Sequence, residues 1–267
     1  MKLAELLFPF KKGAARVSKE AQDEPSVVLI SMYKGGSTFL QQSLKTMLLS
    51  RGFALVDFAG DAFRAGMDEA QYCIENSAKF VEKGKFFGAF RGAYVRHFAD
   101  MSDNKIVIHV RDPRDCVVSL YYSWAYSHGA PGGDKEQEFL ELREQTRLKD
   151  INEFVLERGK DFAEILDAIQ VVKDRYPSAF LSHYEEMVTD FETWLGKLQS
   201  FLDLDLPDGV LNKVRASAHT GVREENVSRH VRQVTPGDHK RKLRADVQER
   251  LTELLRPQLE QFGYLHG

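Results

Sequence analysis

Short apolar runs recur along this chain, and stretches with helical periodicity separate most of them. Strands that alternate with helices in this way form a parallel sheet covered by helices. A chain of 267 residues, 43% of them hydrophobic, can bury such a core as one domain. We therefore expect a single α/β domain over residues 25–267, with a central parallel sheet flanked by helices, after an N-terminal segment over residues 1–24. The five predicted strands are Val27–Met32, Phe53–Phe58, Phe86–Phe90, Lys105–Val110 and Ala179–His183.

The overall composition narrows the class of partner. The formal net charge is −3, from 37 basic and 40 acidic residues, so no global field favours nucleic acid or an anionic membrane. Two cysteines, Cys73 and Cys116, are too few for a disulfide framework and predict buried thiols in a reducing cytoplasm. At the N-terminus the charges follow a short apolar patch, Leu6–Phe10, which is the reverse of a secretory signal. We expect no stable membrane insertion and leave the oligomeric state open.

A glycine-containing turn follows the first predicted strand and precedes the helical pattern of Phe39–Ser50. At such a junction, the unpaired backbone N–H groups and the helix dipole favour an anion. The hydroxyls add donors and Lys34 adds a positive charge. The turn is not a Walker A loop, because there the lysine follows the last glycine. We predict an anion-binding loop, with an ordinary strand-to-helix turn as the alternative. Its residues are Tyr33, Lys34, Gly35, Gly36, Ser37 and Thr38.

A second basic site follows the fourth predicted strand. Arg111 comes directly after that strand, and Asp112 and Pro113 are typical of the start of a helix, which we expect over Pro113–His128. Ser119 lies two turns into this helix. Because ligands of open parallel sheets bind beyond the carboxyl ends of the strands, Arg111 and the Lys34 loop are expected at one edge. The alternative for Arg111 is an ion pair with a neighbouring aspartate.

The stretch between Gly129 and Asp150 is glycine-rich and then heavily charged. Such a composition suits a mobile lid or a solvated helix better than core. We therefore treat residues 129–150 as a possible lid or acceptor-binding insertion.

These segments together resemble those of the sulfotransferases that use 3′-phosphoadenosine-5′-phosphosulfate (PAPS). The turn Tyr33–Phe39 is similar to the family's loop for the 5′-phosphosulfate, and Val110–Ser119 is similar to its 3′-phosphate motif, RDPRDxxVS. His183–Met187 is similar to a segment whose tyrosine, here Tyr184, lies near the adenine. Arg232–Lys240 is similar to a closing element, RKGxxGDW, whose arginine and neighbouring backbone hold the 3′-phosphate.

The resemblance implies a P-loop-like sulfotransferase fold and an in-line, metal-independent transfer of the sulfuryl group to a hydroxyl or amine. It implies that PAPS is the co-substrate and that the acceptor is a small molecule or a carbohydrate. The donor would be bound by Lys34, Gly35, Gly36, Ser37, Thr38, Phe39, Arg111, Ser119, Tyr184, Arg232 and Gly237. Lys34 would also stabilise the charge that develops on the leaving phosphate. The closing element departs from the family, because Gln233, Val234 and His239 replace its lysine, glycine and tryptophan.

A hydroxyl acceptor also needs a general base. Cytosolic members of the family use a histidine, but the corresponding stretch here is Gly88–Gly92 and contains none. Heparan-modifying members use a glutamate after the second strand. We therefore predict Asp57 as the base and Asp61 as the second candidate, with ordinary strand-end or cap carboxylates as the alternative. His97 and His109 are weaker candidates, and His109 is expected to be a hydrogen-bonded core residue.

Two other classes of function remain open from the sequence. A phosphoryl-transfer enzyme of the P-loop type shares the strand, anion loop and helix, but it needs magnesium ligands, usually with an aspartate at a strand end. Arg111 occupies one such position. The third reading is a non-catalytic nucleotide-binding protein.

Overall fold

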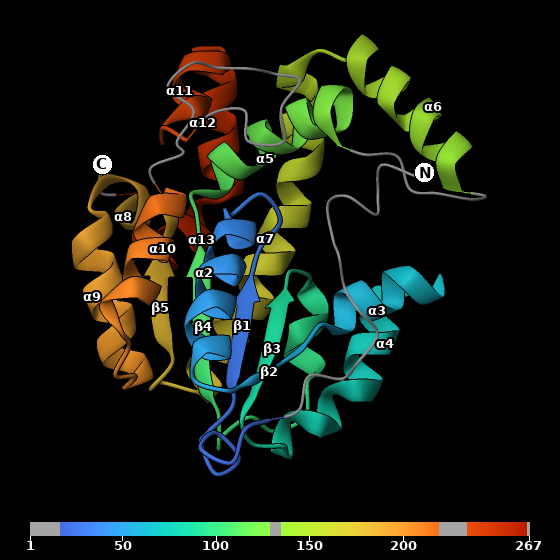
Figure 1. Ribbon diagram of the computed structural model, residues 1–267. Helices are drawn as coiled ribbons and strands as arrows, with labels where there is room; N and C mark the ends of the chain where they lie inside the picture. Colours follow the sequence, from blue (N-terminus) through green and yellow to red (C-terminus); the bar gives the residue numbers. More distant parts are fainter. Residues whose placement is uncertain (1–16, 129–134, 219–233, 266–267) are drawn as a thin grey trace.

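The computed structural model describes residues 17–128, 135–218 and 234–265. Within these ranges, five strands form one parallel sheet in the order β2-β3-β1-β4-β5 (Figure 1). The chain is thus a single α/β domain, as the alternating pattern predicts. The strands are β1 (Val27–Ser31), β2 (Ala54–Val56), β3 (Lys85–Phe90), β4 (Lys105–Val110) and β5 (Phe180–His183).

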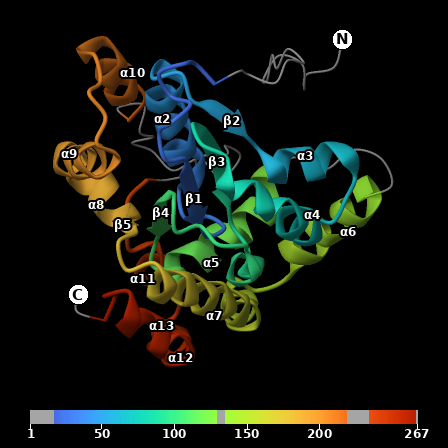
Figure 2. The same cartoon turned by 90° about the horizontal axis from the view of Figure 1, so that it is seen from below.

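Helices cover both faces of the sheet, with α2, α9 and α10 on one face and α7, α12 and α13 on the other (Figure 2). The described helices are α2 (Ser37–Ser50), α3 (Phe58–Ala65), α4 (Glu69–Asn76), α5 (Pro113–Tyr122), α6 (Lys135–Leu148), α7 (Ile151–Arg175), α8 (Tyr184–Thr189), α9 (Phe191–Leu202), α10 (Asp208–Ala218), α11 (Asp238–Lys242), α12 (Ala245–Leu254) and α13 (Arg256–Gln261). Short helical turns are η1 (Ser77–Val81), η2 (Ala93–His97) and η3 (Ser123–Ser127). No helix among the described residues is long and apolar enough to cross a membrane.

The central strand β1 is apolar along most of its length because both of its faces are buried. Val28 and Ile30 pack in the core under α7, whereas Val27 and Leu29 pack in the core under α2. A strand between two helical layers has no solvent face, so it shows a continuous apolar run instead of an alternating one.

The order of the strands creates a crevice beside β1. After β1 the chain goes to β2 and returns through β3, and it then crosses to β4 on the other side of β1. At such a reversal the loops after the two neighbouring strands diverge, and ligands of open α/β sheets bind between them. The loops after β1 and β4 are those that contain Lys34 and Arg111.

Three predicted elements end earlier than expected. The first strand stops at Ser31, one residue before Met32. The second strand stops at Val56 instead of Phe58, because the Asp57 side chain accepts a hydrogen bond from the Gly60 N–H at 3.0 Å and caps α3. The helix expected over Pro113–His128 is α-helical only to Tyr122 and continues as the π-helical turn η3. Its predicted start is confirmed, since the Asp112 side chain caps it. Of the predicted lid, residues 129–134 lie outside the described residues and α6 forms much of the rest.

Candidate functional site

The turn after β1 holds two residues in the left-handed region of backbone conformation, Lys34 at φ 61° and Gly36 at φ 85°. Gly36 also has no room for a side chain, since a Cβ atom would lie 2.6 Å from the ring of Tyr184. Glycine is therefore required at this position for both backbone and packing reasons. The tight turn lets α2 begin at Ser37, directly above the end of β1 (Figure 1).

The start of α2 presents donors to the crevice. In the described part of the chain, no backbone acceptor is recorded for the N–H groups of Gly36, Ser37 and Thr38. The first N–H groups of a helix have no partner within the helix, and the helix dipole adds partial positive charge there. The predicted anion loop therefore has the geometry of an anion cradle. Thr38 is exposed, and Phe39 packs edge-on against Phe191 of α9.

Arg111, directly after β4, is buried beside this loop and has only 6% of its surface exposed. Its Nη1 donates to the carbonyl of Lys34 at 3.2 Å, and its guanidinium carbon lies 4.3 Å from the centre of the Tyr184 ring. Its Nε has no hydrogen-bond partner among the described residues although it is buried. A buried, unpaired guanidinium N–H is costly unless a ligand accepts from it. The geometry thus favours an anion at Arg111.

Tyr184 connects three of the predicted segments. Its ring covers Gly36 on one side and meets the Arg111 guanidinium, and its hydroxyl donates to the carbonyl of Val234 at 2.8 Å. The first, second and fourth segments of the sequence motif set therefore meet around this ring. Arg232, the predicted arginine of the closing element, lies outside the described residues.

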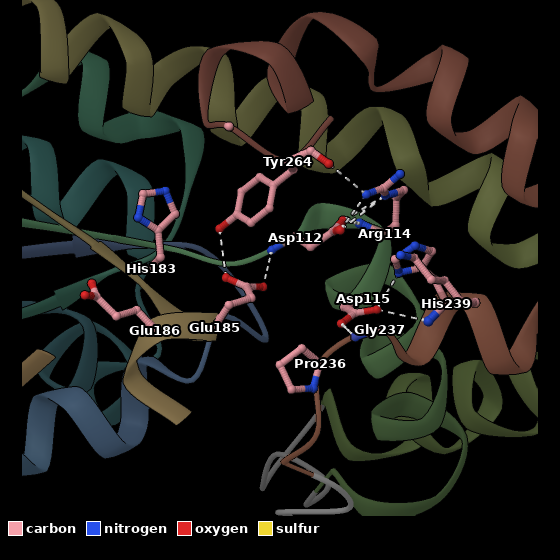
Figure 3. Close-up of a pocket in the computed structure, with 12 residues that line it drawn as sticks. Asp112, Arg114, Asp115, His183, Glu185, Glu186, Pro236, Gly237, His239 and Tyr264 are labelled. Atoms are coloured by element: carbon pink, nitrogen blue, oxygen red, sulfur yellow. Dashed lines mark hydrogen bonds and ion pairs between the residues drawn. The ribbon is translucent and has the colours of Figure 1, made fainter. Parts of the chain in front are cut away.

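Asp115 anchors the closing element to the start of α5. Its carboxylate accepts from the backbone N–H of Gly237 at 2.7 Å and of His239 at 3.0 Å, and it contacts His239 Nδ1 at 2.6 Å (Figure 3). It also pairs with Arg111 Nη2 at 3.6 Å. Burial raises the pKa of Asp115, but the His239 hydrogen bonds and the Arg111 charge outweigh it and hold this pKa well below its usual range. Asp115 is therefore a buried carboxylate that stays ionised.

Sequence reasoning did not identify Asp115 or His239 as residues of the site. An aspartate in the first turn of a helix is already explained by the helix dipole, so nothing local indicates a second partner. Gly237 is a predicted donor-binding residue, and its backbone N–H is held beside the start of α5 by the hydrogen bond to Asp115.

The two candidate bases are placed differently. Asp57 is half-buried at the carboxyl end of β2, where it caps α3. Asp61 is more exposed and forms an ion pair with Arg64 at 2.5 Å. Asp57 thus has the cap role that was its alternative, whereas Asp61 has a surface ion pair that was not predicted. Of the two, Asp57 ends a strand at the edge of the sheet that carries the anion loop.

Arg91 follows β3 in the stretch where a histidine was sought. Its Nε donates to the hydroxyl of Ser37 at 2.8 Å and its Nη2 donates to Gln41 Oε1 at 2.9 Å. The guanidinium of Arg91 is therefore a cation at the first turn of α2, in addition to Lys34. The sequence analysis included Arg91 in the stretch Gly88–Gly92 but predicted no role for it. His97 is exposed.

Ser119 is half-buried in α5, on the helix that follows Arg111.

A cavity of about 560 Å³ is lined by Asp115 and by residues at the starts of α5 and α8, in α11 and near the C-terminus (Figure 3). Of the predicted donor-binding residues that the structure describes, Gly237 is the one that lines this cavity. Its acidic groups have protein partners, since Glu185 accepts from the Asp112 N–H at 3.0 Å and the Tyr264 hydroxyl at 3.1 Å. Burial raises the pKa of Glu185.

An open parallel sheet with unpaired helix N–H groups after its first strand and a buried arginine after the neighbouring strand, among the described residues, is an arrangement that favours an anionic ligand at this edge. The chain belongs to the sulfotransferase domain family, whose profile matches residues 24–263. Among solved structures, it is similar to mouse sulfotransferase SULT7A1 complexed with PAP. The two chains share 17% sequence identity, the match covers 91% of this chain and 85% of that one, and the TM-score is 0.56. This likeness shows a common fold. No curated protein matches the chain.

Proposed function

We propose that this sulfotransferase moves the sulfuryl group of PAPS to a hydroxyl or amine of a small molecule or carbohydrate. The observation that carries the proposal is the buried Arg111, whose Nε lacks a partner among the described residues and whose Nη1 touches the loop with the unpaired N–H groups. The loop and Arg111 both contact the ring of Tyr184, so two anion sites would lie close together there. A nucleotide with a phosphate at each end of its ribose matches this arrangement.

Each predicted residue has a role in this proposal. The loop from Lys34 to Phe39 holds the 5′-phosphosulfate, Tyr184 lies near the adenine, and Arg111, Ser119 and Arg232 hold the 3′-phosphate. Gly237 supports this site through its bond to Asp115. Confinement of the nucleotide to the crevice would place the sulfur in front of the first turn of α2.

The transfer is proposed as an in-line displacement. The acceptor oxygen forms a bond to sulfur while the bond between sulfur and the bridging phosphate oxygen breaks, and adenosine 3′,5′-bisphosphate leaves. Negative charge grows on that oxygen, and fixed N–H dipoles with the Lys34 ammonium stabilise it without reorganisation. The acceptor proton goes to a carboxylate. Asp57 is the first candidate because it ends β2 at the same edge of the sheet, and Asp61 is the second.

Calorimetric titration tests the donor assignment. We expect the protein to bind adenosine 3′,5′-bisphosphate in EDTA and to prefer it to ATP. Binding of ATP alone, and only with magnesium, would instead support a phosphoryl transferase. A screen of hydroxyl and amine acceptors with radiolabelled PAPS then separates an enzyme from a protein that only binds the nucleotide.

We also propose a reducing cytoplasmic location, because Cys73 and Cys116 are both buried unpaired thiols.

A further inference from the structure

His109 is a fully buried histidine on β4, two residues before Arg111, and both of its ring nitrogens have partners. Nε2 lies 2.8 Å from the carbonyl oxygen of Gly35 in the anion loop. Nδ1 lies 2.9 Å from the hydroxyl oxygen of Ser182, which is its neighbour on β5 in the sheet register. Trp194 of α9 donates its indole N–H to the same hydroxyl at 2.8 Å.

The partners fix the protonation of one ring nitrogen, and burial fixes the other. A carbonyl oxygen only accepts, so Nε2 must bear the proton that it shares with Gly35. An indole only donates, so the Ser182 oxygen accepts from Trp194. Burial lowers the pKa of His109 to about 4, so the ring is neutral at physiological pH. In a neutral ring with Nε2–H, Nδ1 is an acceptor, and the Ser182 hydroxyl donates to it.

This arrangement has a consequence for the anion loop. In a trans peptide the C=O of one residue and the N–H of the next point in opposite directions. When His109 draws the Gly35 carbonyl inward, the N–H of Gly36 is turned away from the sheet. This N–H is one of the three at the start of α2 for which no acceptor is recorded in the described chain.

We propose that His109 is a positioning residue that sets the direction of the Gly36 N–H, and thereby the anion affinity of the loop, through a relay from Trp194 and Ser182. Arg111 acts beside it, since it holds the preceding carbonyl, that of Lys34. His109 of β4 and Arg111, directly after β4, thus hold two consecutive peptide groups of the loop. The inference concerns the loop, and its binding test rests on the proposed function.

Three variants separate positioning from general stability. His109→Leu removes the donor to Gly35, whereas His109→Gln keeps an N–H at about the reach of Nε2. Val107→Ala is the matched control, because Val107 is buried on the same strand two residues before His109, and its apolar side chain cannot donate a hydrogen bond to the loop. We expect His109→Leu to weaken binding of adenosine 3′,5′-bisphosphate by about 10- to 100-fold, the worth of one charged hydrogen bond. His109→Gln should recover most of that loss and Val107→Ala should bind as the wild type does.

Calorimetry measures the affinities, and the thermal midpoint of each variant shows how far it is destabilised. Equal affinity of His109→Leu and Val107→Ala would overturn the proposal, as would equal losses in the leucine and glutamine variants.

The tautomer provides a second test that needs no ligand. Nitrogen-15 spectra of histidine-labelled protein at neutral pH should show a neutral Nε2–H ring, assigned to His109 by its loss in His109→Gln. An Nδ1–H ring or a protonated ring would refute the relay. If the wild type shows the expected tautomer but does not bind the bisphosphate, the proposed function fails and the relay stands.

Discussion

Replacement of Arg111 by alanine is the sharpest test of the nucleotide site. The substitution removes the buried guanidinium whose Nε has no partner in the described chain and whose Nη1 holds the Lys34 carbonyl. A hydrogen bond to a charged group contributes about 1.5–3 kcal/mol. With the phosphate contact alone counted, the expected loss is about 1.5–3 kcal/mol, or about 10- to 150-fold in the dissociation constant for adenosine 3′,5′-bisphosphate.

The assay is calorimetric titration of the wild type, Arg111→Ala, Arg111→Lys and a matched control. Arg114→Ala is that control, because Arg114 lies three residues further along but is already paired with Asp112 at 2.7 Å. Its loss should lower stability and leave the affinity unchanged. Arg111→Lys keeps the charge without the planar fork of donors, so it should bind with intermediate affinity.

The reasoning would be refuted if Arg111→Ala bound the bisphosphate as tightly as the wild type, or if Arg114→Ala lost as much affinity. In the first case no phosphate contacts the guanidinium. In the second case the loss would reflect damage to the start of α5.

Three further outcomes follow from the site. Lys34→Ala should lower kcat more than donor affinity in a radiolabelled PAPS assay, because the ammonium meets charge that develops during transfer, and an equal effect on both would contradict this role. Asp57→Asn should keep bisphosphate binding but lose about 10²- to 10⁴-fold in turnover, with a smaller loss in Asp61→Asn, and near-normal turnover of Asp57→Asn on the true acceptor would exclude it as the base. Asp115→Asn should flatten the acid dependence of the melting temperature, since a carboxylate whose folded pKa is lowered stabilises the fold above its unfolded pKa of about 3.9 and loses that effect as the pH falls toward its folded value. An equal fall of the melting temperature in the two proteins as the pH is lowered from about 6 to about 2 would argue against that contribution.

The parts of the fold that depend on neighbouring residues were predictable from sequence. The strand β4 and the start of α5 have the predicted bounds, because an apolar run, an aspartate cap and a proline follow one another directly. The end of α5 was not predictable in the same way. No glycine or proline occurs in residues 114–128, so no local signal in the sequence marks the change to a π-helical turn at Ser123.

The candidate site likewise contains residues that local sequence signals predict and residues that only long-range contacts bring in. The anion loop and Arg111 were found because each follows a predicted strand, and parallel strands bring their ends to one edge. The contact of Asp115 with His239 joins residues 124 positions apart, and each has an adequate local explanation, so no signal in the sequence connects them. Arg91 was passed over because the comparison with the family sought a histidine there.

The hydrogen bond from Arg111 to the Lys34 carbonyl fixes how far apart the two phosphates of a bound ligand must lie. It fastens the loop after β1 to the end of β4, so the separation of the two anion sites cannot change without breaking it. On the proposed function, the protein then selects the donor by the spacing of its two phosphate groups. Adenosine 5′-phosphosulfate fills one end only, and a 2′,5′-bisphosphate presents its second phosphate at the wrong ribose carbon. Both should bind weakly because no phosphate reaches the Arg111 site, although each carries the 5′ group that the loop binds.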